Sequence, residues 1–142
     1  PTHSSTRWVA PVGPPVVVVH AFRRPVADWA PGHRGVDLQA DVGASIRSPA
    51  DGVIAFKGIV AGRPVVVVRH GPLRSTFEPA TTSLAVGTAV AKGSSVATLQ
   101  AAAELGHCSP TSCLHWGVLR GEQYLDPMSL LAPRRVRLLP LP

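Results

Sequence analysis

The sequence has few charged residues, few aromatic residues and no long apolar run. Charged residues make up 15% of the 142 residues and aromatic residues 5%, whereas 45% are hydrophobic. This composition excludes a disordered chain. The longest apolar runs, residues 16–19 and 65–68, are as short as a strand, and a membrane-spanning helix needs roughly 18 residues. The sequence therefore predicts a folded domain without a transmembrane segment.

A chain of this length is the size of one domain. We expect an extended lead-in at residues 1–15, the domain at 16–131 and a basic, proline-rich tail at 132–142 that lies loosely on the surface. The chain begins at Pro1, so an export signal would lie outside this sequence.

The chain also has little negative charge to balance its arginines and lysines. Its net charge is +6 and its pI is about 10.7, which favours anionic partners such as cell-wall polymers, lipid headgroups or nucleic acid. The basic residues are scattered apart from two short clusters at 23–24 and 134–137. We therefore expect no nucleic-acid binding, and a membrane or nucleic-acid binder has only the charge in its favour.

The sequence has only two cysteines, Cys108 and Cys113, separated by four residues. A pair this close can close a small disulfide loop in an oxidising compartment. We expect this disulfide, and hence an exported protein, with free thiols as the alternative.

Short β-branched runs punctuated by glycine, proline and aspartate fill most of the chain. They predict strands at residues 16–20, 46–49, 53–60, 65–70, 73–77, 88–90, 95–99 and 114–119. Such spacing is typical of an antiparallel sheet or sandwich. Helix is limited to a turn or two at 100–105 and a short helix at 126–131, with Asp126 as its N-cap.

Two histidines and one carboxylate stand out among these segments. His33 and Asp37 are four residues apart in a segment rich in glycine and proline, which predicts a loop. His115 lies in an apolar strand, where alternation places Cys113 on the same face. Three such ligands with one open position for water are typical of a catalytic zinc site.

Six sequence blocks occur in an order that resembles one known family. They are Gly-His-Arg-Gly-Val-Asp at 32–37, Ser-Pro-Ala-Asp-Gly-Val-Ile at 48–54, the valine run and His-Gly at 65–71, Gly-Thr-Ala-Val-Ala-Lys-Gly at 87–93, Leu-His-Trp at 114–116 and Tyr-Leu-Asp-Pro at 124–127. Together they resemble the lysostaphin/LytM-type zinc endopeptidases, which cut peptide cross-bridges in bacterial peptidoglycan. The resemblance implies a mainly β, single-domain fold of the duplicated-hybrid-motif kind, with a groove above a central antiparallel sheet.

The resemblance also implies roles for individual residues. His33, Asp37 and His115 match the family's Zn²⁺ ligands. Trp29 and Arg34 would line the substrate groove, where Arg34 could meet an acidic stem peptide. The expected partners are stem or cross-bridge peptides of peptidoglycan, with weak contact to the anionic cell envelope.

The sequence departs from the family pattern at both histidines that assist catalysis without binding zinc. Cys113 replaces the first histidine of the His-x-His motif, and Ala80 lies about where the second histidine is expected. Glu78 or His107 could replace them as the general base. Alternatively, Cys113 could be a fourth, thiolate ligand that would close the coordination sphere and abolish hydrolysis.

Two hypotheses follow. In the first, the domain is an exported zinc endopeptidase that hydrolyses peptidoglycan peptides. In the second, it is a catalytically degenerate member of the same fold that binds peptidoglycan or regulates a partner hydrolase.

Overall fold

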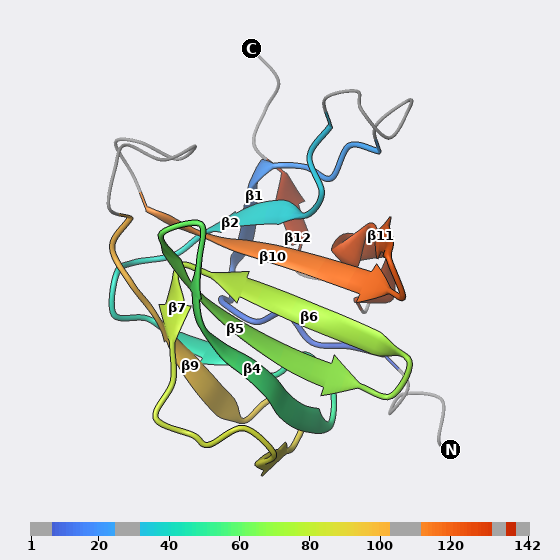
Figure 1. Ribbon diagram of the computed structural model, residues 1–142. Helices are drawn as coiled ribbons and strands as arrows, with labels where there is room; N and C mark the ends of the chain where they lie inside the picture. Colours follow the sequence, from blue (N-terminus) through green and yellow to red (C-terminus); the bar gives the residue numbers. More distant parts are fainter. Residues whose placement is uncertain (1–6, 25–31, 103–111, 132–135, 139–142) are drawn as a thin grey trace.

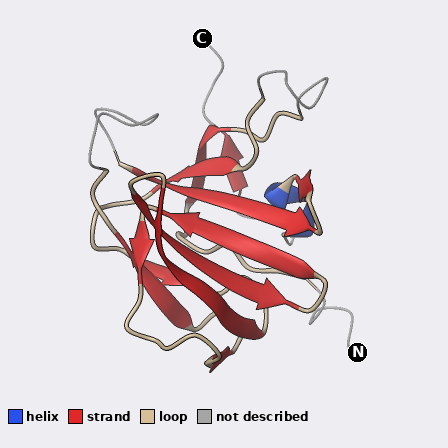
Figure 2. Cartoon of the chain, in the orientation of Figure 1, coloured by secondary structure: helices blue, strands red, loops and turns tan. Residues whose placement is uncertain are grey.

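Strands dominate the structure, a computed structural model that describes residues 7–24, 32–102, 112–131 and 136–138 (Figures 1 and 2). A nine-stranded sheet has the order β12-β1-β2-β10-β6-β5-β4-β8, with β11 also paired to β10. Its strands are β1 (Val16–His20), β2 (Val36–Gln39), β4 (Gly52–Val60), β5 (Arg63–His70), β6 (Leu73–Glu78), β8 (Ala89–Val90), β10 (Cys113–Arg120), β11 (Gln123–Leu125) and β12 (Val136–Leu138). A three-stranded sheet has the order β3-β9-β7, formed by Ser45–Arg47, Ser95–Leu99 and Ala80–Thr81.

Alternating burial along the strands builds the core. On β6, Leu73, Ser75 and Phe77 are buried while the residues between them are partly exposed, as expected for a strand with one face on the core. Phe77 packs in one cluster with Leu38 and Trp116 from β2 and β10, and all three are fully buried. The middle of the large sheet therefore packs directly on the core, and that is where the candidate site lies.

The prediction of a mainly β, antiparallel fold is confirmed. The strands β1 and β9 have the predicted limits, and β4, β5, β6 and β10 differ from them by at most two residues at each end. The loop prediction is wrong for Asp37, which lies in β2. The glycine-rich approach suggested a loop, but the flanking Val36 and Leu38 are fully buried between two neighbouring strands. Burial on both sides stabilises a strand that the local sequence does not favour.

The segments at both ends of the chain contribute more than we expected. Trp8 and Val12, from the predicted lead-in, are buried in the core. The tail does not simply lie loosely, because β12 pairs in parallel with β1. Asp126 caps a 3₁₀ helix at Pro127–Leu130, as predicted, whereas the predicted turn at 100–105 falls partly outside the described residues. Within the described ranges, no helix is long and apolar enough to cross a membrane.

A chain of hydrogen bonds with defined donors and acceptors connects β5, β6 and β10. The His70 Nδ1–H donates to the carbonyl oxygen of Asp51 at 3.1 Å, so Nε2 is left to accept from the Ser75 hydroxyl at 2.8 Å. The Trp116 indole N–H donates to the same hydroxyl oxygen at 3.2 Å. This set of donors and acceptors requires a neutral His70 ring. Burial favours the neutral form, because it lowers the pKa of His70 below its ordinary value of 6.5.

The hydrogen bonds of His70 predict a pH dependence of stability. In the unfolded protein His70 gains a proton near pH 6.5, whereas in the folded protein it does so only at lower pH. The free energy of unfolding should therefore fall as the pH drops below 6.5. Urea unfolding at pH 7.5 and pH 5.5 measures this, and the His70→Gln variant should show a shallower pH dependence. An identical pH dependence in this variant and in the wild type would contradict the assignment.

Candidate metal centre

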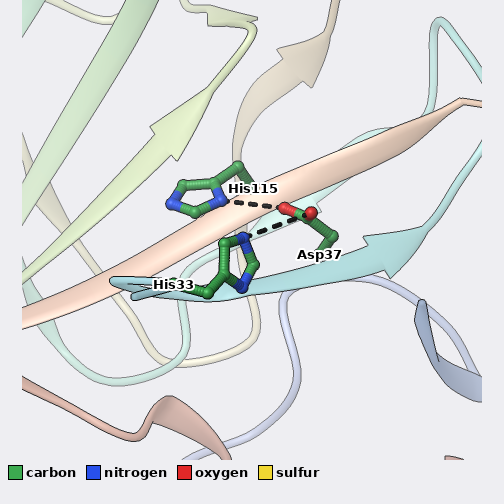
Figure 3. Close-up of side chains that lie close together, drawn as sticks. All are labelled: His33, Asp37 and His115. Carbon is green, nitrogen blue, oxygen red and sulfur yellow. Dashed lines mark hydrogen bonds and ion pairs between the residues drawn. The ribbon is translucent and has the colours of Figure 1, made fainter. Parts of the chain in front are cut away.

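The pairing of β2 with β10 brings together two residues that are far apart in the sequence. Asp37 and His115 lie directly opposite each other in this antiparallel pair, where side chains on one face are about 4.5–5.5 Å apart at Cβ. His33 precedes β2, and its backbone N–H and C=O both bond to Arg23. The three side chains point toward one another from these segments (Figure 3). The fold therefore assembles the three predicted ligands in one place.

The ligand atoms of His33, Asp37 and His115 all lie within 4.8 Å of one another. His115 Nδ1 is 2.8 Å from Asp37 Oδ1, and His33 Nε2 is 3.3 Å from Asp37 Oδ2. Only 1% of the Asp37 side chain is exposed, against 15% for His33 and 24% for His115. A carboxylate this deeply buried needs nearby positive charge or hydrogen-bond donors.

The orientation of His33 favours a metal ion. Its Nδ1 is 3.0 Å from the carbonyl oxygen of Ala21, and since a carbonyl can only accept, Nδ1 carries the proton. The other ring nitrogen, Nε2, faces the carboxylate of Asp37 at 3.3 Å. Two imidazole nitrogens with one carboxylate oxygen suit zinc.

A third histidine reaches the same carboxylate. His20 Nδ1 lies 3.0 Å from Asp37 Oδ2, and its ring approaches that of His33 edge-on, with centroids 6.1 Å apart. The sequence analysis did not single out His20, which ends a valine-rich strand. Only the register of β1 against β2, which pairs His20 with Asp37, identifies it.

Glu78 lies next to the cluster without belonging to it. It pairs with His115 across β6 and β10, and its Oε2 is 3.6 Å from the guanidinium of Arg63. Glu78 is thus on the strand beside a metal ligand, as a replacement base would have to be. Ala80, where a catalytic histidine was expected, is 1% exposed on β7.

Three predicted site residues, Trp29, His107 and Cys108, lie outside the described residues.

Cys113 is not a free thiol, and it is not part of the His–Asp–His cluster, which argues against a thiolate ligand. Its disulfide with Cys108 stays a prediction. Arg34 is exposed, with its guanidinium 5.5 Å from the centre of the Tyr124 ring, and its role in a substrate groove also stays a prediction.

The structure is thus a mainly antiparallel β-sheet that carries a possible His–Asp–His metal site around the buried Asp37. Residues 31–127 match the family model described as Peptidase family M23, so the chain belongs to this family of lysostaphin/LytM-type peptidases. The resemblance seen in the sequence is thereby confirmed.

Sequence relatives occur in mycobacteria. The uncharacterized protein Rv2891 of Mycobacterium tuberculosis is 38% identical over 149 residues, which cover 99% of this chain and 58% of Rv2891. The uncharacterized protein Mb2915 of Mycobacterium bovis matches to the same extent. The chain thus spans 58% of the length of these curated relatives.

Solved structures share the fold. Lysostaphin superposes with a TM-score of 0.70 at 18% identity, covering 87% of this chain and 53% of lysostaphin. A zinc-containing peptidase from Vibrio cholerae superposes with a TM-score of 0.69 at 22% identity, covering 86% of this chain and 39% of that peptidase. At these identities the likeness shows the fold alone.

The packing around Gly35 predicts an effect on the metal centre. A Cβ at this position would lie 2.7 Å from His115 Nε2 and 2.6 Å from the carbonyl oxygen of Trp116. Gly35→Ala should therefore displace the His115 ring, weaken zinc binding and cost roughly 1–3 kcal/mol of stability. Zinc titration and urea unfolding measure the two effects.

Gly58→Ala is the matched control, because a Cβ there would meet only the exposed ring of Phe56. Zinc affinity should be unchanged in this control. Full zinc affinity in Gly35→Ala would show that the His115 ring does not need this space.

Proposed function

We propose that the domain is an exported zinc endopeptidase that hydrolyses peptide bonds in the stem or cross-bridge peptides of bacterial peptidoglycan. The observation that carries the proposal is the cluster of His33 Nε2, Asp37 and His115 Nδ1 on the central sheet. Membership of peptidase family M23 supports both the reaction and the substrate class.

The chain's own residues set the charge and shape of this site. His33, Asp37 and His115 would hold zinc, which supplies a Lewis acid that polarises a carbonyl and lowers the pKa of water. Two neutral imidazoles and one carboxylate neutralise only half of a divalent charge. Three protein ligands also leave one position for substrate or water. The buried position of Asp37 in β2 holds the donor set in place.

Glu78 is our candidate general base. In the pairing of β6 with β10, Glu78 lies directly opposite His115. The guanidinium of Arg63, 3.6 Å away, restrains the Glu78 carboxylate. His107 is the alternative base.

A catalytically degenerate domain that binds peptidoglycan or regulates a partner hydrolase is the second candidate. The buried Ala80 favours it, because a methyl group cannot accept or donate a proton where the family pattern places a histidine. A domain of this kind would bind zinc and murein peptides without cleaving them.

The proposed function predicts that the zinc-loaded protein releases peptide fragments from purified cell walls. His115→Ala should reduce the release rate by more than the roughly 10–100-fold typical of residues one layer beyond the ligands. Chromatography of the soluble products measures the rate, and Thr98→Ala, an exposed residue of β9, should retain it. Zinc binding without any fragment release by the wild type would favour the degenerate domain.

A separate prediction concerns Glu78. If its carboxylate is the general base, Glu78→Gln should lower kcat by about 10²-fold or more and leave zinc affinity unchanged. Glu122→Gln, an exposed acid in the turn after β10, is the matched control. An unchanged kcat in Glu78→Gln would transfer the role to another residue.

A further inference from the structure

We propose that His20 is a positioning residue that fixes the carboxylate of Asp37 for metal binding. The inference rests on the zinc site proposed above and adds a histidine that the ligand motif does not contain. It follows from three observations: the contacts of the carboxylate, an irregularity in β1 and the bonds made by the residues that follow β1.

The first observation is how the two oxygens of Asp37 divide their neighbours. Oδ1 faces His115 Nδ1 at 2.8 Å. Oδ2 faces His20 Nδ1 at 3.0 Å and lies 3.3 Å from His33 Nε2. The Nδ1–H of His20 can donate to Oδ2, because a carboxylate only accepts. This bond restrains rotation of the carboxylate and so fixes the direction in which it faces His33 and His115.

The second observation is the register of β1 against β2. Val18 pairs with Leu38, but two residues later His20 pairs with Asp37, which is only one residue along β2. Regular pairing would place Val19 opposite Asp37. The irregularity therefore brings an imidazole to the carboxylate in place of a valine, and bulges commonly re-aim side chains beside functional sites.

The third observation is that the residues after His20 orient a second ligand. The carbonyl oxygen of Ala21 accepts the Nδ1–H of His33. Arg23 exchanges two backbone hydrogen bonds with His33, at 2.9 and 2.8 Å. One short segment, residues 20–23, thus holds both Asp37 and His33 in their metal-binding orientations.

His20 itself is not a ligand in this arrangement. It is not a member of the group whose ligand atoms all lie within 4.8 Å of one another. Its side chain is 45% exposed, whereas the ligands are more deeply buried. A histidine that donates to a ligating carboxylate from outside the coordination sphere strengthens metal binding by pre-orienting that carboxylate.

The experiment compares zinc affinity in three variants of the full chain. His20→Ala removes the donor, His20→Asn keeps an N–H donor close to the position of Nδ1, and Val19→Ala controls for weakening of β1. Competition with a chromophoric chelator should show roughly 10–100-fold weaker binding for His20→Ala. His20→Asn should recover most of this loss, and Val19→Ala should bind like the wild type.

The visible spectrum of the Co²⁺-substituted protein separates a positioning residue from a ligand. The spectra of His20→Ala and the wild type should have the same shape, because both keep the same three ligands. A changed coordination spectrum would make His20 a ligand and overturn the proposal. Wild-type affinity in His20→Ala, equal losses in the Ala and Asn variants, or an equal loss in Val19→Ala would each overturn it too. A wild type that binds no zinc would overturn the metal site as well.

Discussion

The pairing of β2 with β10 places a buried carboxylate opposite a histidine, and the rest of the site depends on this pair. Asp37 is 1% exposed, and a carboxylate at that depth is strongly destabilising unless positive charge or donors surround it. Three histidines converge on it from β1, from the segment before β2 and from β10. Donors on these rings offset the cost of burying Asp37. A metal ion bound here, as we propose, would share its charge and would be held at one place on the sheet.

The strands beside this pair determine what the site can do. On one side, β6 presents Glu78 next to His115, and on the other, β1 presents His20 next to Asp37. From the sequence motifs we predict that Ala80 and Cys113 stand where the family's additional histidines are expected. On this prediction the chain keeps the metal donors and differs in the groups around them. Catalysis depends on whether a carboxylate can take over the task of an imidazole.

Much of the fold and the three ligands could be predicted from the sequence. Short runs with β-branched residues, bounded by glycine and proline or by polar residues, predicted β1 and β9 at their observed limits. His33, Asp37 and His115 were identified by their residue types and by the family pattern. The strand at Asp37 was missed because its stability comes from burial between β1 and β10, which no local pattern records. His20 was missed because an irregular register, which is a property of two strands together, brings it to the carboxylate.

The most direct test of this account is anomalous diffraction at the zinc edge from crystals of the zinc-loaded protein. The account predicts one zinc ion bound by His33, Asp37 and His115, with His20 hydrogen-bonded to Asp37 outside the coordination sphere. Zinc bound by Cys113, or the absence of zinc from this cluster in protein that remains folded, would contradict it.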